Sequence, residues 1–98
     1  MMRLEVSGLI EGDLDEIADY IARQSPRKAV SFIRDIRTKF HDIGRNPLLY
    51  QLRPDIGESA RLVTVERYVI LFRVVGDVVR IERVVYGGRD LPTVMEAS

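Results

Sequence analysis

The stretch "YVILFRVVGDVVRIERVVY" (residues 68–86) decides the fold, because it predicts two β-strands joined by a tight turn. Apolar and polar side chains alternate on both sides of Gly76-Asp77, and a two-residue loop with glycine is typical of a β-hairpin. A third strand with the same period precedes this hairpin. The three predicted strands cover residues 61–65, 68–75 and 78–86.

The short loop also predicts which residues of the hairpin lie opposite one another. Arg73 is expected opposite Arg80, and Ile70 opposite Arg83. One face of the hairpin is then apolar apart from Arg83, and it is expected to lie under helices. The other face carries arginines and Glu82, and we expect it to be too polar to form a second dry core.

Two amphipathic helices and one short strand are predicted upstream of these strands. Apolar residues recur at helical spacing after Ser7 and again after Ser25, and both serines are expected N-caps. Gly44 is expected to end the second helix as a left-handed cap. The short strand covers residues 3–6. The apolar stripes of this helical hairpin are broad enough to cover a sheet as well as each other.

The segment between the second helix and the third strand, residues 45–59, is predicted to be a loop because prolines and glycine interrupt it. Three large apolar residues lie in it: Leu48, Leu49 and Tyr50. We expect them to fold back onto the core, and the alternative is an exposed contact for a partner.

Composition limits the chemistry of the chain. With 98 residues it is expected to be a single domain, residues 1–98. It has no cysteine and one histidine, His41, so thiolate nucleophiles, catalytic triads and multi-histidine metal sites are excluded, and no metal or cofactor is expected. No apolar stretch approaches the roughly 20 residues that span a bilayer, and no signal peptide is visible. No membrane contact and a cytoplasmic location are therefore expected.

The charge balance disfavours nucleic acid as the main partner. The chain has 15 basic and 15 acidic residues, whereas nucleic-acid binders usually carry a basic excess. Thirteen of the basic residues are arginine, and only Lys28 and Lys39 are lysine. Arginine suits ion pairs and protein interfaces, although a GC-rich genome explains the same bias.

Arg83 departs from the apolar pattern of its predicted face. A buried guanidinium needs a carboxylate or carbonyl partner. We expect a structural ion pair with an acidic residue of the first helix, such as Asp13. The alternative is a functional charge that reaches out at the sheet edge.

Arg73 opposite Arg80 is unfavourable, because like charges face each other across two strands. Glu82 lies diagonally and offsets part of the repulsion. This face is either an ordinary solvated surface or a surface that binds an anion or a partner. In the second case Arg61, Tyr86 and Arg89 contribute to it.

Four segments, taken in order, resemble the ParE/RelE toxin superfamily of type II toxin–antitoxin modules. They are "DLDEIADYIA" (13–22), "AVSFIRDIRTKFHDIGRNPL" (29–48), "RYVILFRV" (67–74) and "VRIERVVYGGRDL" (79–91). The similarity covers nearly the whole chain and is closer to the ParE branch, sometimes called plasmid stabilisation proteins. The ending "RVVYGGRDL" resembles that branch's Arg-Val-Leu-His-Gly-Arg-Arg-Asp, with Tyr86 where His is common and Gly88 where Arg is common.

The resemblance implies an α+β fold in which an N-terminal strand and an α-helical hairpin pack with a small, mostly antiparallel sheet (β-α-α-β-β-β), the hairpin covering one face. It also implies a hetero-oligomer with a cognate ParD-like antitoxin. ParE-like toxins poison DNA gyrase and block replication. RelE-like toxins cut mRNA in the ribosomal A site, with basic residues and often a C-terminal Tyr or His.

The two branches predict different sites in this chain. A gyrase inhibitor, which is not an enzyme, would bind its target through Arg73, Arg80, Tyr86 and Arg89. An endoribonuclease would use Arg61, Arg73 and Tyr86 as catalytic residues on the ribosome. The sequence pI of about 6.6 favours the gyrase inhibitor, because a ribosome-docking protein is expected to be basic. The departures at Tyr86 and Gly88 leave a third reading open, an inactive relative that only binds its antitoxin.

Overall fold

The computed structural model describes residues 2–98, and within them it confirms the predicted α+β fold and element order. The elements are β1 (Arg3–Val6), α1 (Ile10–Ala22), α2 (Pro26–Arg45), the 3₁₀ turn η1 (Pro47–Leu49), β2 (Ala60–Val65), β3 (Tyr68–Val75), β4 (Val78–Tyr86) and α3 (Leu91–Glu96). The sheet order is β1-β4-β3-β2, with β1 parallel to β4 and the other neighbours antiparallel.

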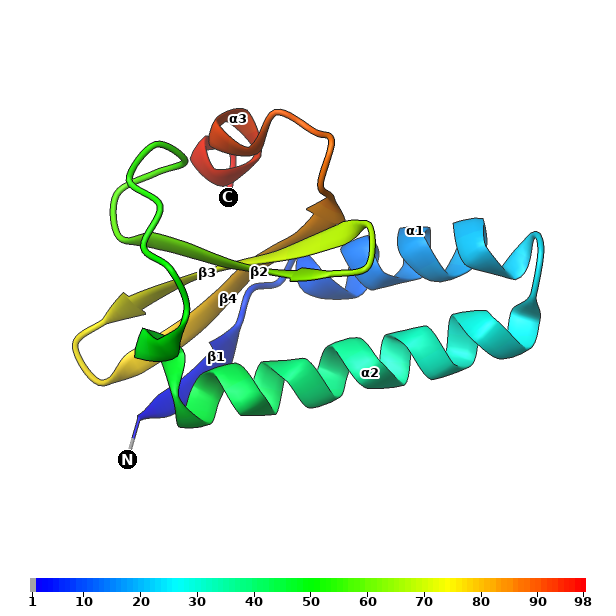
Figure 1. Cartoon of the computed structure of the whole chain (residues 1–98), viewed down its shortest axis with the longest axis horizontal. Helices are drawn as coiled ribbons and strands as arrows, with labels where there is room; N and C mark the ends of the chain where they lie inside the picture. Colours follow the sequence, from blue (N-terminus) through cyan, green and yellow to red (C-terminus); the bar gives the residue numbers. More distant parts are fainter. Residues whose placement is uncertain (1) are drawn as a thin grey trace.

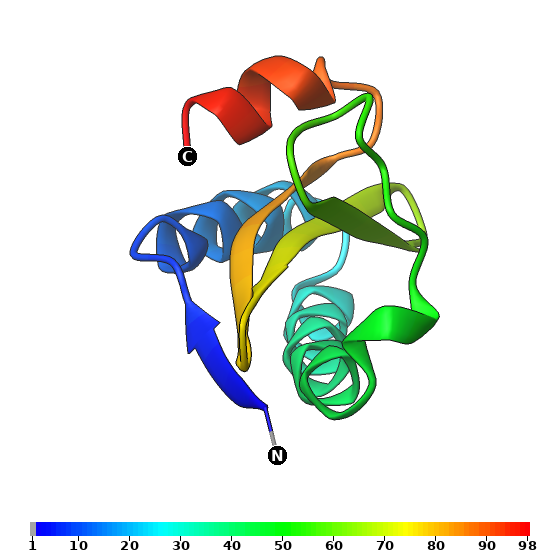
Figure 2. The same ribbon diagram turned by 90° about the vertical axis from the view of Figure 1, so that its left-hand side faces the viewer.

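The helical hairpin of α1 and α2 covers one face of the sheet, and α3 lies on the opposite face (Figures 1 and 2). Buried apolar side chains from both helices meet those of the sheet. This hairpin-side core consists of Ile10, Leu14, Ile17, Phe32, Ile36, Phe40, Ile43, Ile70, Phe72, Val79, Ile81 and Val84. The helical spacing in α1 and α2 and the alternation in β3 and β4 place these residues together.

The helix ends agree only partly with the predicted caps. Ser25 caps α2 as expected, because its hydroxyl accepts a hydrogen bond from the backbone N–H of Lys28 at 3.1 Å. The prediction for Ser7 was wrong, since its hydroxyl accepts from Leu9 N–H and α1 starts only at Ile10. Gly44 does not end α2 either. It lies inside the helix, where Leu4 of β1 packs against it.

A β-bulge divides the hairpin of β3 and β4. The predicted register holds near the turn, where Gly76 has φ +60° and Arg73 lies opposite Arg80. Beyond Phe72 the register shifts by one residue, so Arg83 lies opposite Leu71 and not opposite Ile70 as predicted. A bulge places one extra residue on one strand and turns the following side chains to the other face.

The second face of the sheet forms a second apolar cluster, contrary to the prediction. We call it the C-terminal cluster, and it consists of Ile56, Ala60, Val69, Leu71, Val85, Val94 and Met95. The prediction failed because it did not include α3. Asp90 caps this short helix by accepting a hydrogen bond from Thr93 N–H, and the helix brings Val94 and Met95 back over the sheet.

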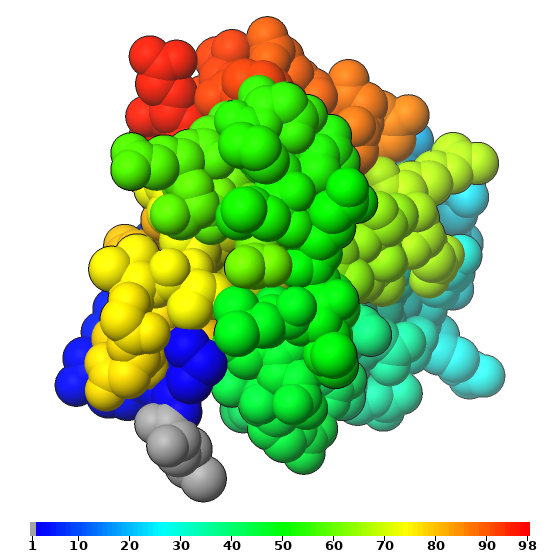
Figure 3. All heavy atoms as spheres, turned by 60° about the vertical axis from the view of Figure 1, so that its left-hand side comes forward, coloured from blue at the N-terminus to red at the C-terminus, as the bar shows by residue number. Residues whose placement is uncertain are grey.

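The segment between α2 and β2 runs as a ridge from α2 to α3 (Figure 3). Tyr50 folds back onto the hairpin-side core as expected, with its ring edge-on to Phe72 at 5.8 Å. Leu48 and Leu49 do not, because they are 68% and 80% exposed. Within residues 2–98, no helix has the length and hydropathy required to cross a bilayer.

Candidate functional site

Arg83 and Asp13 form a buried ion pair that ties α1 to β4, which confirms the expected contact. Arg83 Nε and Nη2 each donate to one carboxylate oxygen of Asp13 at 2.8 Å. The same carboxylate accepts the backbone N–H of Val84 at 3.0 Å. The hydrogen bond to Asp13 raises the pKa of Arg83. Both oxygens of the carboxylate and two nitrogens of the guanidinium are paired, so the pair has a structural role.

Arg73, Arg80 and Glu82 form a charged cluster on the α3 side of the sheet. Glu82 is 4% exposed, and its carboxylate accepts from Arg73 Nη1 at 3.1 Å and from Arg80 Nε at 2.9 Å. Arg73 Nε also donates to the carbonyl of Glu58 at 3.2 Å, and Arg80 Nη1 lies 3.6 Å from Glu5. The two arginines therefore neutralise a buried carboxylate, and Arg73 anchors the loop that leads into β2.

Arg61 lies apart from this cluster. It is opposite Phe72, whose side chain belongs to the hairpin-side core, whereas Arg73 is opposite Ala60 of the C-terminal cluster. Arg61 Nη1 donates to the carbonyl of Tyr50 at 2.6 Å. The structure thus separates Arg61 from Arg73 by the thickness of the sheet.

Tyr86 lies at the far end of β4, six residues beyond Arg80, which corresponds to about 20 Å along a strand. A groove of about 540 Å³ opens there between α1 and the end of the sheet. We call it the tyrosine groove, and its lining residues are Asp13, Glu16, Ile17, Asp19, Tyr20, Arg23, Arg67, Tyr68, Val84, Val85, Tyr86 and Arg89. Of the predicted target-binding residues, only Tyr86 and Arg89 come together in it.

Three tyrosines give the groove aromatic surfaces. Tyr20 is 63% exposed and Tyr86 54% exposed, and the ring of Tyr68 packs edge-on to Tyr86 at 6.4 Å. Burial raises the pKa of Tyr68. Exposed tyrosines are enriched in the energetic centres of protein interfaces.

Arginines supply the cationic part of the groove. The guanidinium of Arg23 lies 5.9 Å from the centre of the Tyr20 ring. Among the described residues 2–98, Arg23, Arg67 and Arg89 have no carboxylate within 4.0 Å. Glu16 and Asp19 of α1 line the same groove. Tyrosine and arginine beside acidic residues suit a protein partner with charges of both signs.

Gly88 and Tyr86 are physically coupled. A Cβ atom built at Gly88 would overlap the ring of Tyr86, so the ring occupies the space that a side chain at position 88 needs. The two departures from the ParE-like ending thus depend on each other. An arginine at position 88 would displace the Tyr86 ring.

No three His, Asp or Glu side chains gather in a metal-binding arrangement anywhere in residues 2–98. His41 lies exposed on α2. The residues that line the tyrosine groove offer aromatic, cationic and acidic contacts to a binding partner.

Comparison with known proteins agrees with this architecture. Residues 4–91 match the family model described as ParE toxin of type II toxin-antitoxin system, parDE. The chain belongs to the ParE toxin family. A solved structure of the chromosomal ParDE TA system from P. aeruginosa superposes with a TM-score of 0.76 at 28% identity, covering 88% of this chain and 96% of that one. The comparison with curated proteins finds no match.

In this ParE toxin, four aromatic and cationic residues of the tyrosine groove were not predicted from the sequence: Tyr20, Arg23, Arg67 and Tyr68. One signal was available in the sequence. Tyr20 follows the acidic residues of α1 and leaves an aromatic ring on the exposed side of the helix. The pairing of Tyr68 with Tyr86 depends on the bulge, which the alternating pattern does not reveal.

Proposed function

We propose that this ParE toxin inhibits DNA gyrase by binding it through the tyrosine groove, in the cytoplasm, and that it is not an enzyme. The groove is the observation that carries the proposal. It combines two tyrosines that are more than half exposed with three arginines from separate turns. Tyrosine and arginine dominate the binding energy of many protein interfaces.

The endoribonuclease alternative has weaker support. It requires Arg61, Arg73 and Tyr86 around one phosphodiester, because metal-independent RNA cleavage needs cations and an acid or base within hydrogen-bond reach. Arg61 and Arg73 belong to opposite faces of the sheet, and each already donates hydrogen bonds within the chain. Tyr86 lies at the far end of β4.

We further propose that a ParD-like antitoxin neutralises this chain in a hetero-oligomer. Family membership supports a cognate antitoxin, since the family is defined by toxin–antitoxin modules. The exposed Leu48 and Leu49 offer apolar surface for it. On the sheet face opposite the helical hairpin, α3 and the C-terminal cluster already cover part of the surface, which leaves less room for an antitoxin there.

The first experiment is a supercoiling assay with purified gyrase and the purified toxin. Inhibition is expected, together with early loss of DNA synthesis and intact translation in pulse-labelled cells. Tyr86→Ala and Arg89→Gln are each expected to weaken inhibition at least tenfold, because they remove groove contacts while the core stays intact. Arg3→Gln is the matched control, since Arg3 is an exposed arginine outside the groove that pairs with Glu5.

Three outcomes contradict the proposal in different ways. Early loss of translation with normal supercoiling would favour the endoribonuclease. Unchanged gyrase inhibition in both groove variants would move the binding site elsewhere. No effect on either process from soluble, folded protein would indicate an inactive relative that only binds its antitoxin.

A further inference from the structure

The two helices of the hairpin carry opposite charges. Between its first and last residues, α1 has five acidic residues and no basic one. The neighbouring α2 has six basic residues and two acidic ones. The zero net charge of the chain is therefore an average over a strongly acidic helix and a strongly basic helix.

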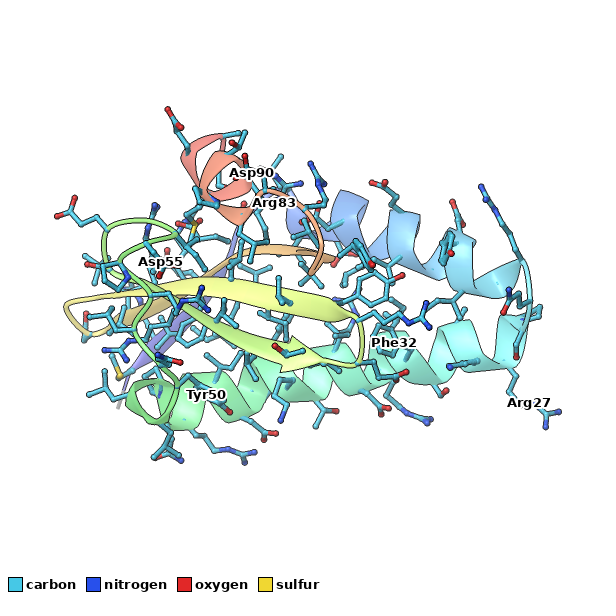
Figure 4. The ribbon with its side chains drawn as sticks, turned by 45° about the horizontal axis from the view of Figure 1, so that its top comes forward. Arg27, Phe32, Tyr50, Asp55, Arg83 and Asp90 are labelled. Atoms are coloured by element: carbon cyan, nitrogen blue, oxygen red, sulfur yellow. The ribbon has the colours of Figure 1, made fainter. Side chains whose placement is uncertain are left out.

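Half of the cations on α2 have carboxylate partners. Arg37 donates to Glu11 of α1 at 3.0 Å, and Lys28, Arg37 and Arg45 are the three residues in ion pairs. Arg27, Arg34 and Lys39 have no carboxylate within 4.0 Å among residues 2–98. Arg27 projects into solvent at the end of the hairpin, away from the sheet (Figure 4).

Two of these unpaired cations, Arg27 and Arg34, lie along the outer side of α2. Arg27 and Arg34 are two turns apart and therefore share a side of the helix, about 10 Å from each other. Arg45, which is paired with Asp42, lies three further turns along on the same side, and all three arginines are exposed. The row follows the helix away from the buried Phe32 and Ile36 and takes no part in lining the tyrosine groove.

The position of Arg27 at the start of the row is not explained by helix stability. The first turn of α2 contains Arg27 and Lys28 and no acidic residue. Cations at a helix N-terminus oppose the positive end of the helix dipole and destabilise the helix. By contrast, the first turn of α1 has Glu11 and Asp13, which suit the dipole.

We propose that the outer face of α2 binds the phosphate backbone of duplex DNA. A linear row of arginines fits a linear polyanion, and DNA-binding proteins position themselves with Arg, Lys, Ser and Thr on phosphates. Ser31 and Thr38 are the hydroxyl residues of α2. Val30 is the one large apolar side chain of α2 that is exposed, so this face lacks the aromatic residues of a protein interface.

This binding does not depend on gyrase inhibition. It is sequence-independent, because backbone contacts carry no base information. It would concentrate the toxin on DNA, whichever target the tyrosine groove recognises.

The test measures binding of the full chain to a fluorescent 20-base-pair duplex by anisotropy across a salt series. Arg27→Gln/Arg34→Gln is compared with the control Arg3→Gln/Arg53→Gln, which removes the same charge from one exposed and one partly exposed position outside α2. Wild type and control are expected to bind in low salt. The α2 variant is expected to bind roughly tenfold more weakly, with a log–log salt slope smaller by about 1–2, since each phosphate contact contributes about 0.9.

Equal affinity and slope for the two double variants would overturn the proposal, and so would absence of wild-type binding near 50 mM salt. Binding to poly-L-glutamate but not to DNA would assign the face to an acidic protein instead. The same variants are assayed for gyrase inhibition. Loss of DNA binding with gyrase inhibition intact would support the α2 assignment, and gyrase inactivity with DNA binding intact would count only against the proposed function.

Discussion

The two faces of the sheet are buried by different means. On the hairpin side, two helices with long apolar stripes cover a continuous apolar core. On the other side, a six-residue helix covers only the C-terminal cluster, and the remaining space holds the Arg73–Arg80–Glu82 cluster. The comparison shows that two long amphipathic helices cover a continuous apolar core, whereas a short helix leaves room for charges that must neutralise one another.

The largest expected effect is loss of the hairpin-side core. Phe72→Ala is expected to lower the free energy of unfolding by about 3–5 kcal/mol, because it removes a fully buried ring. Urea denaturation followed by circular dichroism measures the change. Val75→Ala, at an exposed position of the same strand, is the control and is expected to stay within about 0.5 kcal/mol. Equal losses in the two variants would contradict the assignment of the core.

The Asp13–Arg83 pair links the two regions, since it ties the hairpin to the strand beyond the bulge. Asp13→Ala is expected to cost about 3 kcal/mol, because it leaves the guanidinium and the Val84 N–H without their acceptor. The double variant Asp13→Leu/Arg83→Met is expected to recover part of the loss. A double variant less stable than Asp13→Ala would show that the pair contributes more than mutual neutralisation.

The charged cluster provides the next smaller effect. Glu82→Gln is expected to cost about 2 kcal/mol, since it weakens two charge-assisted hydrogen bonds and leaves Arg73 facing Arg80. Adding Arg80→Ala to Glu82→Gln should reduce the loss, and a double-mutant cycle measures the coupling. If the changes in unfolding free energy of the two substitutions simply add, the side chains of Glu82 and Arg80 are solvated independently and do not interact.

The smallest effect concerns Tyr68 at the edge of the hairpin-side core. Burial raises its pKa above the ordinary value of 10.0, so the folded state favours the neutral phenol. Its contribution to stability is complete at neutral pH and is lost as pH rises above 10. Phenolate absorbance should therefore keep rising to higher pH in the unaltered chain than in Tyr68→Phe. The same end point in both chains would contradict the shift.

Much of the fold follows from local patterns. The helical spacing in α1 and α2 and the Gly76-Asp77 turn are properties of neighbouring residues, so they were predictable. The site was less predictable. The position of the bulge determines which face Glu82 and Arg83 take, and a strictly alternating pattern contains no sign of it.

The sequence alone determined the element order, the helical hairpin and the need of Arg83 for a carboxylate, because periodicity and burial of charge act over short distances or single residues. Only the tertiary structure decided that Arg61 and Arg73 lie on opposite faces, that α3 completes a second cluster, and that Tyr20, Arg67 and Tyr86 meet in one groove. These outcomes depend on the register of strand pairing and on the return of the C-terminal segment. Both are set by packing between residues far apart in the chain.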